Sequence, residues 1–173
     1  MQKKMKNFPQ IIVYIDGANL YNGVLSLGKN LDYYKFYRWL KEKYKITKAI
    51  IFIGKTTQNS EIYKYLEKSG FSLIYKKTYK TKVDKIKGNC DAELILKSIE
   101  DAYEKNLQKV ILISGDGDFS CLIDFWKRKN ILCEILAPRK KYCSLFLKRK
   151  NVPLVYIEDI IHKIEKPPRE PEV

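Results

Sequence analysis

The chain has 173 residues, with 34 Lys and Arg against 20 Asp and Glu, a formal net charge of +14. A chain of this length buries about two thirds of the surface that its unfolded form exposes, so neither disulfides nor a structural metal is needed for folding. No apolar run approaches the roughly 20 residues of a membrane span, and "IIVYI" is too short for a signal-peptide core. We therefore predict a cytoplasmic protein with no membrane partner.

Apolar runs of strand length alternate along the chain with stretches of helical period. Strands are predicted at 11–15, 49–54, 71–75, 110–114, 131–136 and 154–157. Helices are predicted near 19–25, 32–45, 58–69, 89–105, 118–129 and 141–149. Most of the strand runs are continuously apolar, which is typical of parallel strands buried on both faces. The alternation predicts an α/β fold with three α/β/α layers and a mainly parallel central sheet.

Local signals predict where some of these elements end. Gly70 follows "EIYKYLEKS", and Asn130 follows "DFWKRK", each at a place for a left-handed helix cap. Residues 76–88 have no clear period and are predicted to be a loop. We expect residues 1–165 to form a single domain and the proline-containing residues 166–173 to form a flexible C-terminal tail.

The cysteines do not have the spacing of a metal site. Cys90, Cys121, Cys133 and Cys143 form no C-x-x-C pair, and the only histidine, His162, lies far along the chain. We predict that the cysteines are small buried thiols in a reducing compartment, and that the histidine is exposed on a terminal helix.

Four aspartates stand where a parallel α/β sheet collects its ligands. Asp16 ends the first predicted strand, and Asp116 and Asp118 follow the fourth. Asp91 starts a crossover helix, which runs antiparallel to the strands, so its first turn lies at the same carboxyl edge. Each acid alone is explained equally well as a turn or cap residue. Capping does not explain why all four reach one edge, and we favour a metal site.

The surroundings of Asp91 indicate which metal such a site would hold. Ile95 and Ile99 share its helical face, so we expect that face to be the buried one. Buried carboxylates need a partner, and the chain offers no histidine and few arginines nearby. An incomplete cage of carboxylate oxygens suits Mg²⁺ or Mn²⁺. We predict that the four aspartates are the metal ligands.

Basic residues are concentrated in two segments, 75–88 and 138–150. Such patches attract phosphate backbones and release counterions on binding. Tyrosines interleave the first segment and can stack on bases. A solvated face in a lysine-rich proteome is the plainer alternative. The candidate substrate-binding residues are Lys80, Lys82, Lys85, Lys87, Arg139 and Lys140.

Three motifs resemble a known family in their order and spacing: "YIDGANLYNG" (14–23), "KGNCDAELIL" (87–96) and "LISGDGDFSCLI" (112–123). The chain resembles the NYN domains of the PIN-like nuclease superfamily, and within them the LabA-like group. The motifs together span nearly the whole domain. The resemblance implies a PIN-like α/β/α fold with an acidic metal-binding pocket. For several members it implies metal-dependent RNA cleavage that leaves 5′-phosphate and 3′-hydroxyl ends.

The resemblance also assigns roles by position. The four aspartates match the acidic catalytic set, and Asn19 matches the polar catalytic position after the first acid. Lys87 stands at the basic position before the second acid, where it can touch a phosphate. Ser114 and Phe119 match the third motif and shape its turn.

These observations favour a metal-dependent endoribonuclease. No histidine lies near the motifs, so an imidazole acid–base pair is excluded. One or two Mg²⁺ or Mn²⁺ ions would activate water for in-line attack and stabilise the leaving oxygen. The alternative is a non-catalytic RNA-binding or regulatory NYN module. A phosphatase or nucleotide-binding enzyme is disfavoured, because a small substrate needs no extended basic surface. The expected partner is nucleic acid, RNA in particular. A homodimer is possible, and the sequence does not decide the oligomeric state.

Overall fold

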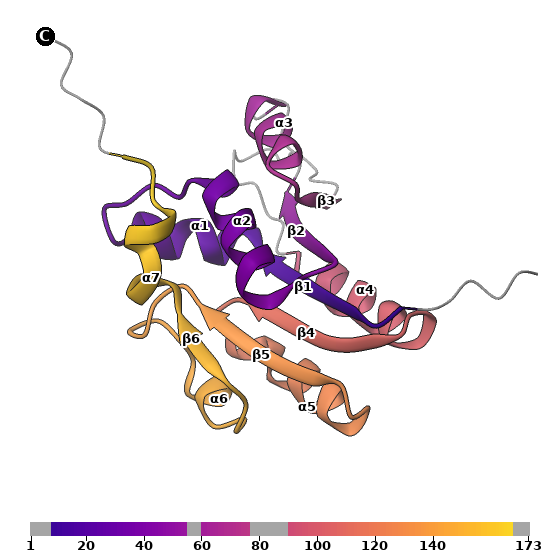
Figure 1. Ribbon diagram of the computed structural model, residues 1–173. Coiled ribbons are helices and arrows are strands. Elements are labelled where there is room, and N and C mark those ends of the chain that lie inside the picture. The colour runs from indigo at the N-terminus through magenta and orange to yellow at the C-terminus, as the bar shows by residue number, and fades with distance from the viewer. Residues whose placement is uncertain (1–7, 55–59, 77–89, 168–173) are drawn as a thin grey trace, which may run out of the picture.

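A six-stranded parallel sheet forms the centre of the computed structural model, which describes residues 8–54, 60–76 and 90–167 (Figure 1). The strands are β1 (Gln10–Asp16), β2 (Lys48–Gly54), β3 (Ser72–Lys76), β4 (Leu107–Ile113), β5 (Leu132–Ala137) and β6 (Leu154–Tyr156). They lie in the order β3-β2-β1-β4-β5-β6, and every neighbouring pair is parallel. The predicted α/β fold with a parallel central sheet is confirmed.

Helices cover both faces of this sheet (Figure 1). They are α1 (Gly17–Leu25), α2 (Tyr33–Tyr44), α3 (Ser60–Lys68), α4 (Asp91–Glu104), α5 (Ser120–Arg128), α6 (Leu145–Lys148) and α7 (Ile157–Ile164). One apolar core joins the sheet to α1, α2, α3 and α7, and a second joins it to α4, α5 and α6. The helix predicted near 141–149 is shorter than expected, because Ser144 caps α6 by accepting the N–H of Phe146.

Strand β1 shows why its apolar run is continuous. Ile12 and Tyr14 belong to the core beneath α4 and α5, whereas Val13 and Ile15 belong to the core beneath α1 and α2. All four side chains are fully buried. Alternate residues of a strand point to opposite faces, so a strand covered on both faces is apolar at every position.

The chain order of the strands creates the crevice that holds the site. From β1 the chain moves outward through β2 and β3, then returns through α4 to β4, on the other side of β1. The connection that leaves β1 and the connection that leaves β4 therefore run to opposite sides of the sheet. In such sheets ligands bind in the crevice outside the carboxyl ends of these two strands. Asp16 is the last residue of β1, and Ser114 directly follows β4.

Two predicted helix caps are confirmed. Gly70 has a φ of 110° and Asn130 a φ of 57°, both in the left-handed region that a helix end requires. The predicted loop at 76–88 lies outside the described residues except for Lys76, at the end of β3. The N–H of Lys166 donates to the carbonyl of Asn30 at 2.9 Å, and residues 168–173 lie outside the described part. The domain bounds stay a prediction.

The prediction of buried cysteines holds for two of the four. Cys133 and Cys143 are buried and Cys90 is half-buried, but Cys121 is exposed, and all four thiols are free. Cys121 lies on the outward side of α5, because Leu122 takes the position toward the core.

The terminal helix is as expected. His162 is exposed on α7, as predicted. Along the described ranges, none of the helices combines the length and the apolar character that a membrane crossing would need.

Candidate metal centre

Three aspartates from distant parts of the chain meet at the carboxyl edge of the sheet. Asp91, Asp116 and Asp118 each contribute a carboxylate oxygen, and these oxygens lie within 4.8 Å of one another. Asp91 is the first residue of α4, and the other two flank Gly117 after β4. Asp91 and Asp116 are half-buried and Asp118 is exposed, so the group is open to solvent on one side. We call Asp91, Asp116 and Asp118 the acidic cluster.

Backbone hydrogen bonds shape the loop that carries two of these acids. The N–H of Asp116 donates to Ser114 Oγ at 3.1 Å, and the N–H of Asp118 donates to Asp116 Oδ1 at 3.0 Å. Asp116 thereby caps the short 3₁₀ helix Gly117–Phe119, whose Phe119 side chain is fully buried. The two carboxylates are held by a local turn that is anchored in the core.

The fourth predicted ligand, Asp16, lies beside the acidic cluster but is not one of the three that converge. Its Oδ1 accepts the N–H of Asn19 at 3.1 Å, and its Oδ2 accepts the hydroxyl of Ser114 at 3.2 Å. Burial raises the pKa of the Asp16 carboxyl, hydrogen bonds from Asn19 and Ser114 oppose the rise, and the charge of nearby Asp116 adds to it. Both oxygens of Asp16 are thus engaged within the protein, and its role as a ligand stays a prediction.

Asn19 also links the end of β1 to the loop after β4. Its Oδ1 accepts the N–H of Gly115 at 2.9 Å, which ties the first turn of α1 to the loop after β4. The motif around Asp16 and the motif around Asp116 are therefore joined by two hydrogen bonds across adjacent strands. The geometry gives Asn19 a positioning role, while its predicted catalytic role stays a prediction.

The predicted inward face of α4 is directed at the sheet. Ile95 and Ile99, which share the helical face of Asp91, are half-buried and pack against the core. Leu94 and Ser98 are the most deeply buried positions of the helix, and Asp91 itself is half-buried. Because Asp91 starts the helix, its carboxylate lies at the rim, where it meets the other two acids.

A buried acid that the sequence did not single out lies at the other end of α4. Asp101 is fully excluded from solvent, accepts the hydroxyl of Tyr14 at 3.0 Å, and pairs with Lys97 at 3.0 Å and Lys105 at 2.8 Å. Lysines four residues before and after an acid on a helix are the signal that could have found it. Its partners make it a structural group rather than part of the acidic cluster.

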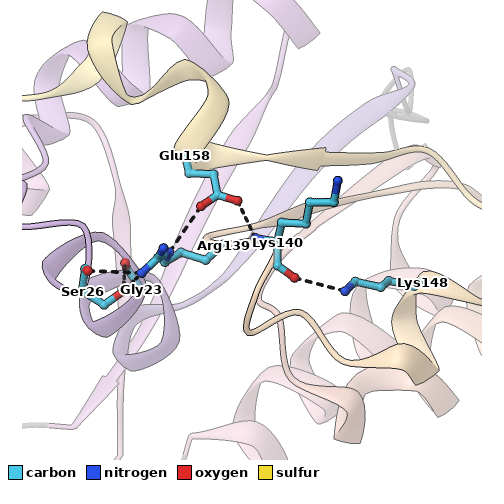
Figure 2. A network of polar contacts seen from close by, with 6 residues as sticks. All are labelled: Gly23, Ser26, Arg139, Lys140, Lys148 and Glu158. Carbon is cyan, nitrogen blue, oxygen red and sulfur yellow. Dashed lines mark hydrogen bonds and ion pairs between the residues drawn. The ribbon is translucent and has the colours of Figure 1, made fainter.

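Two of the predicted substrate-binding residues can be placed. The Arg139 guanidinium pairs with Glu158 at 3.3 Å and donates to the Ser26 carbonyl at 3.2 Å (Figure 2). The backbone N–H of Lys140 donates to Glu158 at 2.7 Å, and its side chain extends away from the network (Figure 2). Arg139 thus links α1 to α7, and the Lys140 side chain is directed outward.

The other predicted basic residues lie outside the described residues: Lys80, Lys82, Lys85 and Lys87. Their predicted contacts with substrate, and those of Arg139 and Lys140, stay predictions.

Comparisons with known proteins agree with this architecture. The NYN domain family model matches residues 10–151, a range that includes every residue of the acidic cluster. The fold is similar to the crystal structure of a protein of unknown function from Vibrio parahaemolyticus, with a TM-score of 0.77 and 23% sequence identity. That likeness covers 94% of this chain and 99% of the other, and it concerns the fold alone. A search of the curated proteins found no match. The chain therefore belongs to the NYN domain family of the PIN-like nuclease superfamily.

Proposed function

We propose that this protein is a metal-dependent nuclease, and specifically an endoribonuclease that hydrolyses phosphodiester bonds with Mg²⁺ or Mn²⁺. The observation that carries the proposal is the convergence of Asp91, Asp116 and Asp118 at the open edge of the sheet. Membership of the NYN family supports a nucleic acid as the substrate. The net charge of +14 supports it too, because a basic surface attracts a polyanion toward a pocket that would otherwise repel it.

The donor set fits a hard divalent cation. All three converging ligand atoms are carboxylate oxygens, which Mg²⁺ and Mn²⁺ prefer over the thiolate and imidazole ligands of zinc or copper. The exposure of Asp118 leaves room for water and a phosphate oxygen. When bound, such a cation supplies Lewis-acid stabilisation of negative charge and an activated water.

The residues around the acidic cluster would hold these ligands in place. Ser114 accepts from the Asp116 backbone and donates to Asp16, so one hydroxyl joins the ends of β1 and β4. Asp16 places a further carboxylate near Asp116, and this charge strengthens the attraction for a cation. The chain contains one histidine, His162, so a catalytic pair of histidines is excluded by composition.

The direct test is a cleavage assay with purified protein. Single-stranded and structured RNA, and DNA of the same sequences, are incubated with Mn²⁺, Mg²⁺ or EDTA. We expect cleavage with either metal, none in EDTA, and none with Asp116→Asn. The matched control is Asp159→Asn, which removes the same charge from an exposed position on α7.

The outcomes of this assay separate the alternatives. Cleavage that persists in EDTA or in Asp116→Asn would remove the proposed mechanism. Salt-dependent RNA binding without any metal-dependent product would instead identify a non-catalytic binding module. Preferential cleavage of the DNA substrates would retain the nuclease and reject the preference for RNA. The proposed products carry 5′-phosphates, which a 5′-phosphate-dependent exonuclease would degrade.

A further inference from the structure

A short aromatic segment packs directly against the loop of the acidic cluster. The N–H of Ser144 donates to the carbonyl of Gly115 at 2.9 Å. A Cβ at Gly117 would collide with Ser144 Oγ and would lie 3.3 Å from Cδ2 of Phe146. The Phe146 ring is therefore a neighbour of the residue that separates Asp116 from Asp118.

Two aromatic residues of this segment are turned toward solvent. Tyr142 is 59% exposed and Phe146 is 70% exposed. Between and beside them, Cys143 and Leu147 are buried in the core under α5 and α6. The segment is thus anchored by its inward residues, and the exposure of the two rings is a property of a packed structure. Exposed aromatic surface of this kind marks an interaction site.

The charge around the Tyr142 ring favours a polyanionic partner. The Arg139 guanidinium carbon lies 5.2 Å, and Lys141 Nζ 5.5 Å, from the centroid of the Tyr142 ring. Residues 138–150 contain six basic residues and no acid. Aromatic rings among cations form the usual platform for single-stranded nucleic acid, in which bases stack and phosphates pair with the charges. An apolar protein partner would leave these charges uncompensated.

A hollow lies beside Tyr142 and extends to Gly115, the residue before Asp116. It has a volume of about 300 Å³, and Tyr142, Asn19 and Gly115 line it together with Asn22 and Ser26. Amide and hydroxyl groups in its wall suit the polar edge of a base. Arg139 also lines the hollow, and its bonds to Ser26 and Glu158 hold that wall in place (Figure 2).

We propose that Tyr142 and Phe146 form a base-stacking subsite for single-stranded nucleic acid beside the acidic cluster. This inference rests on the proposed nuclease function and specifies its substrate as a strand with unpaired nucleotides next to the cleaved phosphate. In a duplex the bases stack on each other and are not available to these rings.

The test measures binding in EDTA, by fluorescence anisotropy, so that no cleavage occurs. The probes are a single-stranded oligonucleotide, the same strand with abasic nucleotides, and the corresponding duplex. We expect Tyr142→Ala and Phe146→Ala each to weaken single-strand binding about tenfold, the usual scale of one lost stacking contact. Binding of the abasic strand and of the duplex should not change, since these lack an available base.

Matched variants separate stacking from general damage. Tyr103→Ala removes another exposed tyrosine, with Lys129 Nζ 3.9 Å from its ring centroid, at the end of α4 remote from Asp91. We expect Tyr103→Ala to bind all probes as wild type does, and Tyr142→Phe to retain single-strand binding. The Mn²⁺ affinity of Phe146→Ala should equal that of the wild type, a result that would show that the acidic cluster is intact.

The results for the subsite and for the nuclease are distinguishable. Unchanged single-strand binding in both alanine variants, or an equal loss for the abasic strand, would overturn the subsite even if the wild-type protein cleaves RNA. If the alanine variants lose base-dependent binding but the wild-type protein cleaves no substrate, the subsite would be supported and the nuclease rejected. A loss of duplex binding alone would also overturn the preference for single strands.

Discussion

The backbone N–H of Gly115 donates a 2.9 Å hydrogen bond to Oδ1 of Asn19, which joins the loop after β4 to the first turn of α1. The two residues are far apart in the sequence but lie at the ends of adjacent parallel strands. Together with the bond from Ser114 to Asp16, this contact closes the switch point of the sheet, where the acidic cluster forms. The rigidity of this junction decides how well the acids can share a cation.

Removing the Asn19 acceptor should weaken that junction. Asn19→Ala leaves the Gly115 N–H without its partner, and we expect a loss of about 1 kcal/mol in the free energy of unfolding. RNA cleavage should fall more than this stability loss explains, because the loop of Asp116 is no longer held. Urea unfolding and initial cleavage rates measure the two effects. Gln108→Ala, which removes an exposed amide near the start of β4, at the opposite end of the strand from the site, is the control. Equal behaviour of the two variants would contradict the positioning role.

A side chain at Gly117 should disturb both folding and metal binding. The added Cβ of Gly117→Ala would collide with Ser144 Oγ, and we expect a loss of about 1–3 kcal/mol in unfolding free energy. Mn²⁺ affinity should also fall, since the displaced turn carries Asp116 and Asp118. Calorimetric titration and urea unfolding test this. Adding Ser144→Ala removes the colliding oxygen, so the double variant should lose less stability than the sum of the single variants; strict additivity would refute the collision.

The acidic cluster should make thermal stability depend on metal. Wild-type protein is expected to gain about 2.7 kcal/mol at a Mn²⁺ concentration of 100 times Kd, because the cation binds the folded state alone. Asp116→Asn should lose this gain and be slightly more stable than wild type in EDTA, since asparagine keeps the cap and relieves the repulsion between acids. Melting curves with Mn²⁺ and with EDTA measure both effects. An equal metal-induced shift in the two proteins would exclude the acidic cluster as the binding site.

Asp101 should contribute stability that disappears in acid. Burial alone would raise the pKa of Asp101, but Lys105 and Lys97 outweigh it and hold the pKa below its usual value. A carboxyl with a lowered folded pKa stabilises above the unfolded pKa of about 3.9 and loses this contribution as the pH falls through the folded value. Asp101→Asn should therefore lower the free energy of unfolding by about 2 kcal/mol at pH 7. The difference from the wild type should shrink as the pH falls below about 4.

The measurement for Asp101 is urea unfolding of both proteins across this pH range. Asp159→Asn on α7 is the control, because its exposed carboxyl is replaced without disturbing a buried pair. A constant difference between wild type and Asp101→Asn from pH 7 to pH 3 would show that the ion pairs with Lys97 and Lys105 do not stabilise the fold.

Local patterns in the sequence predicted the type of sheet and most of the described helices and strands. Continuous apolar runs such as "IIVYI" indicated strands buried on both faces, and parallel crossovers then placed the ends of β1 and β4 and the start of α4 at one edge. The positions of Gly70 and Asn130 could be predicted as well, because a left-handed cap depends on the residue itself.

Only the tertiary structure decided which side chains meet. Leu94 is fully buried whereas Asp91, at the start of the same helix, stays half-buried, because the packing of α4 against the sheet sets the depth of each position. Asp16 accepts a hydrogen bond from Ser114, which follows another strand and which no local pattern identifies as its partner. Arg139 likewise pairs with Glu158 across two elements. The sequence by itself determined the hydrophobic period of each element and the edge of the sheet at which the acids lie. Contacts between distant segments selected the three acids that converge, because these contacts depend on how the layers pack.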